Sequence, residues 1–226
     1  MTNGNICLDK LRVTSIDPTA YYISEFISEE EEKNIINNIY ATPKPKWTQL
    51  SNRRLQNWGG IPHNKGMIAE TIPPWLDHYL ERIHSLNLMG GNKPNHVLVN
   101  EYTPGQGILP HLDGSLFYPT ITTISIASHI VLNFYEPLTD NKSMHPVFSF
   151  LLEPRSLLVL QEKLFNHYLH GIDEVKHDII DDSILNLNMC SNRYSKGSVV
   201  DRRTRISLTI RHVPKTTKFK LNIGKR

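Results

Sequence analysis

In the second half of this chain apolar residues gather in short segments, and the last of them, residues 205–211, alternates between apolar and polar positions with a period of two. Short segments rich in Val, Ile, Leu, Thr and aromatic residues are bounded there by Pro, Gly, Asn or Asp, which is typical of β-strands. These segments are residues 96–102, 120–128, 130–135, 147–152, 156–161 and 205–213. In the first half apolar residues recur three and four positions apart instead, which predicts helices.

Two helices are predicted before residue 91. Ser28 and Glu31 have the spacing of a capping box, and an apolar helical face follows them until Pro43. A second helix is expected to begin near Pro73 and to run to the Gly90-Gly91 pair. Helices followed by a run of strands predict an α+β fold, mostly β: a sandwich or barrel of antiparallel strands flanked by N-terminal helices.

The composition is that of an ordinary globular domain. The chain has 226 residues, of which 39% are hydrophobic and 21% charged, so it is neither disordered nor membrane-embedded in type. Cys7 and Cys190 lie far apart, which argues against a disulfide framework. No basic-then-apolar leader and no long apolar run is apparent, so we expect neither secretion nor a membrane partner.

Positive charge is concentrated at the C-terminal end. From Arg193 to Arg226 there are eleven Lys or Arg residues against one acidic residue, Asp201, a net charge of +10. Such a segment could contact phosphate groups, or it could be a solvated tail that contacts nothing. Charge alone does not separate these two interpretations.

One short motif has the spacing of a metal site. His111 and Asp113 form the only His-x-Asp or His-x-Glu in the chain, and strand residues two apart face the same side. A third ligand could be His167 or His170, and we prefer His170. Two His and one carboxylate form the facial triad of non-haem Fe(II) oxygenases, whereas an exposed His and Asp are the simpler alternative. The other histidines considered lack a partner at metal-ligand spacing and are interpreted as structural or surface residues: His63, His96, His129 and His145.

The strand at residues 205–213 carries two arginines on one face. Arg205 and Arg211 alternate with aliphatic residues, and a guanidinium that points inward requires an anion. Asn100 and Tyr102 share a face of another strand and could donate hydrogen bonds to the same anion. The alternative is the exposed polar face of an edge strand.

Taken in order, these motifs resemble a known family. The order Asn100-Glu101-Tyr102, His111-x-Asp113, a distal His170 and two arginines six apart resembles the AlkB-like Fe(II)- and 2-oxoglutarate-dependent dioxygenases. The resemblance runs from about Tyr21 to Val213. Residues 43–51, 55–60 and 152–160 are also similar to one subfamily of that family.

The resemblance implies a fold, a ligand set and a reaction. It implies a double-stranded β-helix (jelly-roll) core, with Fe(II) held by His111, Asp113 and His170. It also implies that Arg205 pairs with the distal carboxylate of 2-oxoglutarate, within a cosubstrate site made of Asn100, Tyr102, Arg205, Ser207 and Arg211. Such enzymes use O2 to oxidise 2-oxoglutarate to succinate and CO2 while they hydroxylate a substrate C–H bond. A hydroxylated N-methyl group then releases formaldehyde.

The resemblance also implies a domain organisation. We expect an N-terminal extension (1–20), a dioxygenase domain (21–213) and a basic tail (214–226). Within the domain we expect helices and a lid at about 21–95, the β-helix core at about 96–213, and a mobile insertion at about 173–198. From the resemblance we expect this protein to reside in the cytoplasm and the nucleus. No oligomeric state is predicted.

The substrate is the least constrained prediction. Gly114 and Ser115 stand where base-repairing members often carry a further carboxylate, and Ser207 stands where many have Asn. We expect a nucleic acid, DNA or RNA, to be demethylated. The candidate contacts are Trp47, Arg53, Arg54 and Trp58 in the lid, and Tyr118 after the metal motif. Alternatives are plain packing of these side chains, a protein or small-molecule substrate, or a nucleic-acid-binding module with little turnover.

Overall fold

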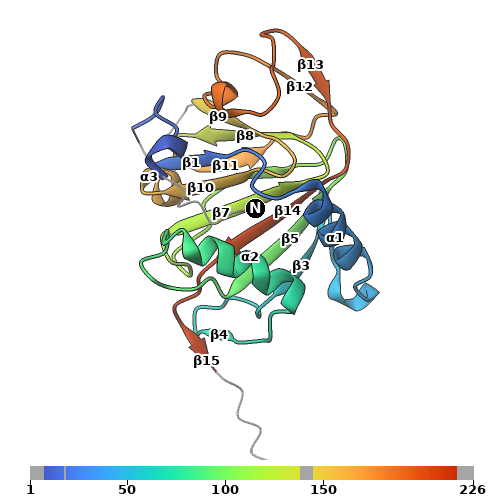
Figure 1. Cartoon of the computed structure of the whole chain (residues 1–226), viewed down its shortest axis with the longest axis vertical. Coiled ribbons are helices and arrows are strands. Elements are labelled where there is room, and N and C mark those ends of the chain that lie inside the picture. Colours follow the sequence, from blue (N-terminus) through green and yellow to red (C-terminus); the bar gives the residue numbers. More distant parts are fainter. Residues whose placement is uncertain (1–7, 18, 138–144, 218–226) are drawn as a thin grey trace, which may run out of the picture.

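Two antiparallel sheets face each other across an apolar interior, and two helices cover the outer side of the larger sheet (Figure 1). This computed structural model describes residues 8–17, 19–137 and 145–217. None of the helices within those ranges has the length and apolar character that crossing a bilayer requires. The paired sheets are the jelly-roll core expected from the sequence.

The larger sheet has seven strands in the order β1-β10-β7-β14-β5-β3-β2. Their bounds are β1 (Ala20–Ile23), β2 (Thr48–Leu50), β3 (Arg53–Trp58), β5 (His96–Tyr102), β7 (Thr120–Ile126), β10 (Leu157–Gln161) and β14 (Arg205–Arg211). The smaller sheet has the order β6-β11-β8-β9, with β6 (Ile108–His111), β8 (Ile130–Tyr135), β9 (Phe148–Leu152) and β11 (Leu169–Ile172). Two further pairs are β12 (His177–Ile179) with β13 (Val199–Asp201), and β4 (Met67–Ile68) with β15 (Thr216–Thr217).

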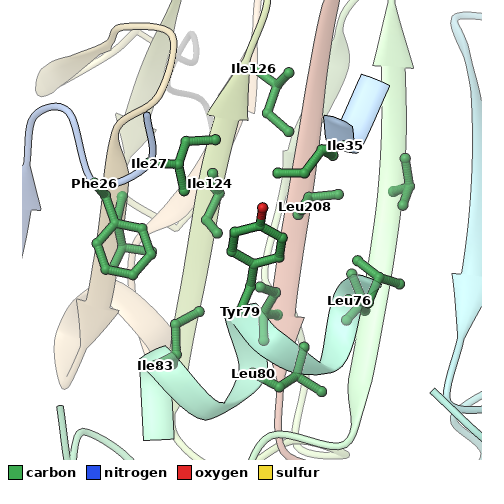
Figure 2. Close-up of a cluster of buried hydrophobic side chains, with 14 of the residues drawn as sticks. Phe26, Ile27, Ile35, Leu76, Tyr79, Leu80, Ile83, Ile124, Ile126 and Leu208 are labelled. Carbon is green, nitrogen blue, oxygen red and sulfur yellow. The ribbon is translucent and has the colours of Figure 1, made fainter. Parts of the chain in front are cut away.

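The helices α1 (Glu29–Tyr40) and α2 (Pro74–Ser85) form as the sequence predicts, and a one-turn helix α3 (Lys163–Asn166) follows β10. Ser28 and Glu31 make both hydrogen bonds of the capping box at the start of α1. Side chains of α2, among them Tyr79 and Ile83, point onto β7 and β14 of the sheet (Figure 2). This packing buries one face of the larger sheet and leaves its other face toward the smaller sheet.

The end of α2 differs from the prediction. The helix ends at Ser85, before the Gly90-Gly91 pair, because Asn87 adopts a positive φ of 52° and its N–H bonds back to the carbonyl of His84. Asn is one of the few non-glycine residues that adopt this conformation at a helix end. The glycines therefore belong to the following turn.

Several strands were not predicted, since they are short or lack clear alternation. The segment expected to hold helices and a lid (21–95) also contributes most of β1, together with β2 and β3, to the larger sheet, where β3 pairs with β5. β6 and β11 were not predicted either, although they hold metal-ligand candidates. The core sheets thus recruit strands from both sides of residue 96.

The polar insertion at residues 173–198 packs onto the outer side of the smaller sheet. Ile180 and Ile184 are buried against Leu151 of β9. Glu153, which is also buried, accepts five hydrogen bonds from Ser191, Asn192 and Tyr194. A polar sequence can hold a fixed position in this way, because one buried carboxylate organises the loop.

Both ends of the described chain are attached to the fold. Near the N-terminus, Val13 is buried, and the backbone of Arg12 forms an isolated antiparallel β-bridge with Tyr21. At the other end, Thr216 and Thr217 pair with β4. The remainder of the predicted basic tail, from residue 218, lies outside the described residues.

Candidate active site

Three possible metal ligands lie close together on the side of the smaller sheet that faces the larger one. His111 ends β6, His170 lies in β11, and the two residues are direct partners in the strand pairing. Their ring centroids are 4.6 Å apart, and His170 Nε2 lies 3.6 Å from Asp113 Oδ2. One donor atom from each of the three residues lies within 4.8 Å of the others, which is the arrangement of a metal site.

The chemistry of these donors fits Fe(II). His111 Nδ1 lies 2.8 Å from the carbonyl of Leu109, so Nε2 is the nitrogen left for a metal. Burial lowers the pKa of His170 to about 4, against a raising effect of Asp113, so its imidazole is neutral near pH 7. Two imidazoles and a carboxylate are the ligands of a facial triad.

Asp113 is held as a carboxylate by its neighbours. Burial would raise the pKa of this group, but the positive charge and hydrogen bond of Arg211, together with His170 and His111, bring it below its ordinary value. Arg211 forms a buried ion pair with Asp113. This arginine therefore connects β14 of the larger sheet to the metal-binding motif.

The two arginines of β14 point into the interior, as a carboxylate-binding site requires. Arg205 and Arg211 are 2% and 7% exposed, and the Nε atom of each is buried without a hydrogen-bond partner among the described residues. Arg205 Nη2 donates to Ser125 Oγ at 2.9 Å, and burial lowers the Arg205 pKa to about 10. A bound carboxylate would satisfy these groups, so the residues fit 2-oxoglutarate.

A single cavity of about 540 Å³ joins the two groups of residues. It is lined by all three metal-ligand candidates and by all five residues predicted for the cosubstrate: Asn100, Tyr102, Arg205, Ser207 and Arg211. Asn100 and Ser207 are direct partners in the pairing of β5 with β14. Metal and cosubstrate candidates thus share one site between the sheets.

Comparison with known proteins decides the family. The model of the 2OG-Fe(II) oxygenase superfamily matches residues 46–211, which include every residue of the cavity motifs described above. The chain belongs to this superfamily. It is therefore a dioxygenase in family, and the fold described above is the one that the AlkB resemblance implied.

Individual relatives place this oxygenase more closely. It is 47% identical, over 99% of its length and all of the relative's, to a zebrafish (Danio rerio) protein named probable RNA/DNA demethylase ALKBH6. This is the sixth AlkB homologue, the subfamily that residues 43–51, 55–60 and 152–160 resemble. A mimivirus protein, L905, is 27% identical over 85% of the chain and 84% of its own length.

Solved structures agree on the fold. OsALKBH1 superimposes with a TM-score of 0.57 at 13% identity, covering 87% of this oxygenase and 98% of that chain. A prolyl-4-hydroxylase from Pseudomonas putida gives a TM-score of 0.50 at 11% identity, with 87% and 94% covered. Both likenesses concern the fold alone.

Not every predicted substrate contact lies at the cavity of the oxygenase. Arg53 of β3 lines it, whereas Arg54, one residue later, points to the opposite face of the sheet. There Arg54 donates to both oxygens of Glu101, at 2.6 and 2.9 Å, and lies 4.1 Å from the ring of Trp47. Trp58 faces the same helix-covered side and packs edge-on against Trp75. For Trp47, Arg54 and Trp58 the packing alternative describes the structure. Arg54 and Trp58 lie on the face of β3 opposite to Arg53, because strand neighbours alternate faces.

In the loop after the metal motif, too, the neighbour of a predicted residue lines the cavity. Phe117 lines the cavity, with the Arg211 guanidinium 4.5 Å from its ring centre, while the predicted Tyr118 packs toward the helix-covered core. A loop has no periodicity that shows which of two neighbours points inward, so the sequence alone did not separate Tyr118 from Phe117. Ser125, which supports Arg205, was not among the predicted residues, because its role depends on the pairing of β7 with β14.

Proposed function

We propose that this oxygenase removes methyl groups oxidatively from a modified nucleic acid. One observation carries the proposal: a relative named as a probable RNA/DNA demethylase is 47% identical over the full chain. The cavity described above supports it, because it combines the facial-triad ligands with a carboxylate-binding strand.

In this proposal, His111, Asp113 and His170 hold Fe(II), and Arg205 binds the distal carboxylate of 2-oxoglutarate. When bound, iron and 2-oxoglutarate supply an O2-dependent hydroxylation of a substrate C–H bond, with succinate and CO2 as coproducts. Asn100, Tyr102 and Ser207 donate hydrogen bonds that orient the cosubstrate, and Arg211 keeps Asp113 ionised. Apolar side chains from both sheets, among them Leu98 and Ile172, line part of the cavity.

The nucleic acid would enter at the side where the β2–β3 turn meets the loop around β6. Ser51, Asn52 and Arg53 provide polar groups on one side of the cavity. Leu109 and Leu112, which are 79% and 39% exposed, provide an apolar side. An extruded base combines a flat apolar face with polar edges, so such a mouth suits it.

The deciding experiment measures succinate release with Fe(II) and 2-oxoglutarate, with and without methylated DNA and RNA in single- and double-stranded form. Stimulation by one polymer, with loss of the methyl group and formaldehyde release, is expected. His111→Ala and Asp113→Ala should abolish it. Stimulation only by peptides or small molecules would redirect the substrate class, and salt-sensitive binding without turnover would leave a binding module. Residence in the cytoplasm and nucleus is part of the proposal, and imaging of the tagged protein tests it.

A further inference from the structure

The cavity wall carries more positive than negative charge. Arg53, Arg205 and Arg211 line it, and within the described ranges Asp113 is the only carboxylate that does so. Asp113 is already paired with Arg211. Burial raises the pKa of the Tyr102 phenol, and the positive charges of Arg205, Arg53 and Arg211 oppose that rise. The three guanidinium groups therefore act on one point in the cavity.

Carboxylates near the cavity are directed elsewhere. Glu101 precedes Tyr102 in β5 but faces the helix-covered side, where it binds Arg54. Asp173 accepts hydrogen bonds from Asn133 and Tyr135. Glu174 bonds to the side chain of Asn52 at the rim, and it is exposed, so that water screens its charge. None of these groups offers a counter-charge inside the cavity.

Arg53 is the arginine whose charge has no partner. Its Nε donates to the uncharged amide oxygen of Asn100 at 3.2 Å, and it forms no salt bridge with any residue that the structure describes. Arg211 pairs with Asp113, and Arg205 is assigned above to 2-oxoglutarate. Fe(II) and the 2-oxoglutarate dianion carry equal and opposite charges, so their binding leaves the positive surplus in place.

We propose that this active site selects an electrically neutral methylated base, and that Arg53 is the side chain that excludes a positively charged one. The inference rests on the proposed function. Methylation of a ring nitrogen, as in 1-methyladenine or 3-methylcytosine, gives a cationic base. Methylation of the exocyclic amine, as in N6-methyladenine or N4-methylcytosine, leaves the base neutral.

The size of the expected effect follows from Coulomb's law. Two like charges about 10 Å apart at an effective dielectric constant of about 20 repel each other enough to weaken binding roughly tenfold. Cation exclusion by Arg53 is therefore large enough to decide between bases of similar shape. A neutral base meets no such repulsion, and its hydrogen-bonding edge can accept from the same guanidinium.

The test compares four oligonucleotides that differ in one base, as single-stranded DNA and RNA. Two carry the neutral methylated bases and two the cationic ones. Binding is measured by fluorescence anisotropy with Mn(II) and 2-oxoglutarate under anaerobic conditions, and methyl loss is measured by mass spectrometry with Fe(II) and O2. The wild type is expected to favour the neutral bases about tenfold in both assays. Arg53→Gln should narrow that ratio, and Arg53→Glu should reverse it.

Lys33→Glu is the matched control. Lys33 is exposed on α1, and its replacement changes the net charge as Arg53→Glu does, without reaching the cavity. This variant should keep the wild-type ratio. The side chain of Arg53 makes a single hydrogen bond, so Arg53→Gln is expected to fold. The base preference can therefore still be measured in this variant should Arg53→Glu fail to fold.

The outcomes separate the two proposals. Equal or better binding and demethylation of the cationic bases overturns neutral-base selection but leaves demethylation standing. A neutral preference that persists in both Arg53 variants overturns the role of Arg53. Failure to demethylate any of the four, while 2-oxoglutarate is still converted to succinate, overturns the proposed function and the inference with it.

Discussion

At the scale of single residues, the site depends on charged groups placed where water does not reach them. Arg205 has a fully buried guanidinium, one neutral hydrogen-bond partner in Ser125 and an unpaired Nε. A group in this position stabilises little by itself, because its charge has lost hydration without gaining a counter-ion. Its arrangement is explained by binding of an anion.

Replacing Arg205 by Lys should therefore weaken 2-oxoglutarate without changing the fold. Lysine keeps the charge but cannot make two parallel hydrogen bonds to a carboxylate, and we expect the KM for 2-oxoglutarate to rise about tenfold or more. Titration of 2-oxoglutarate in a succinate-release assay measures this. Arg203→Lys, an exposed arginine two positions earlier, is the control and should leave that KM unchanged. An equal KM in both variants would contradict the role of Arg205.

Much of the residue-scale site was predictable, and the reason is local. His111 with Asp113, and Arg205 with Arg211, belong to short motifs whose spacing already brings them to one face. Phe117 and Ser125 could not be selected with the same ease. Their roles depend on where a loop turns and on a neighbouring strand, and single-sequence spacing contains neither.

At the scale of elements, β3 shows how one strand serves two purposes. Arg53 faces the cavity, and Arg54 faces α1, where it is held by Glu101 and by the rings of Trp47 and Tyr40. Tyr40 also donates to Glu101 at 2.6 Å. Glu101 is buried, so removal of Arg54 would leave a carboxylate with reduced compensation.

Arg54→Gln should therefore reduce the stability of the fold much more than Arg53→Gln does. We expect Arg54→Gln to lower the free energy of unfolding by about 1–3 kcal/mol, because Glu101 loses its ionic partner. Arg53→Gln should cost less than about 0.5 kcal/mol, as is usual for a half-exposed side chain with one hydrogen bond. Urea unfolding of both variants checks this. Equal stability losses would show that Arg54 has no special structural role.

The insertion at residues 173–198 predicts a specific pH dependence. Burial would raise the pKa of Glu153, but hydrogen bonds from Ser191 and Asn192 outweigh it and hold the pKa below its ordinary value. Such a carboxylate contributes fully to the free energy of unfolding above its unfolded-state pKa of about 4.3. This stabilisation is lost as the pH falls through the lower folded-state pKa.

Glu153→Gln should accordingly destabilise the protein at pH 7. The difference in the free energy of unfolding between this variant and the wild type should shrink as the pH falls below about 4.3. Urea midpoints at pH 7, 5 and 3.5 measure the difference. Glu70→Gln, at a carboxylate 56% exposed, is the control and should show little effect at any of these pH values. A difference that stays constant down to pH 3.5 would exclude the Glu153 carboxylate as its source.

Elements were predictable in proportion to their length and regularity. α1 and β14 follow clear periodic patterns, β5 and β8 are rich in strand-forming residues, and the structure confirms all four. β6 and β11 span four residues each and contain Pro, His or Gly, so their strand character comes from pairing: β6 with β11, and β11 also with β8. The order of the packed insertion likewise depends on Glu153, a tertiary partner that local sequence does not indicate.

At the scale of the whole molecule, the candidate metal site joins the two sheets. His111 and His170 belong to the smaller sheet, and Asp113 follows β6 and is bound by Arg211 of the larger sheet. A metal ion held by all three ligands would therefore stabilise the packing of one sheet on the other. Ligand binding to the folded state alone raises the free energy of unfolding.

Mn(II), which resists oxidation under the assay conditions, should raise the thermal midpoint of the protein. At 100 times its Kd, a ligand specific to the folded state contributes about 2.7 kcal/mol. Differential scanning fluorimetry with and without Mn(II), and after addition of EDTA, measures the shift. His170→Ala should abolish it, whereas His167→Ala, three residues earlier and exposed, should retain it. A retained shift in His170→Ala would remove His170 from the ligand set.

The alternating faces of β3 limit how this protein can change over evolution. Insertion or deletion of one residue between Arg53 and Trp58 would invert every side chain on one side of the change. The cavity would lose its unpaired guanidinium, and the helix-covered face would lose the partner of Glu101. Length changes inside β3 should therefore survive only in steps of two residues or with a compensating bulge. The turn at Ser51-Asn52, which lies outside the pairing with β5, is free of that restriction.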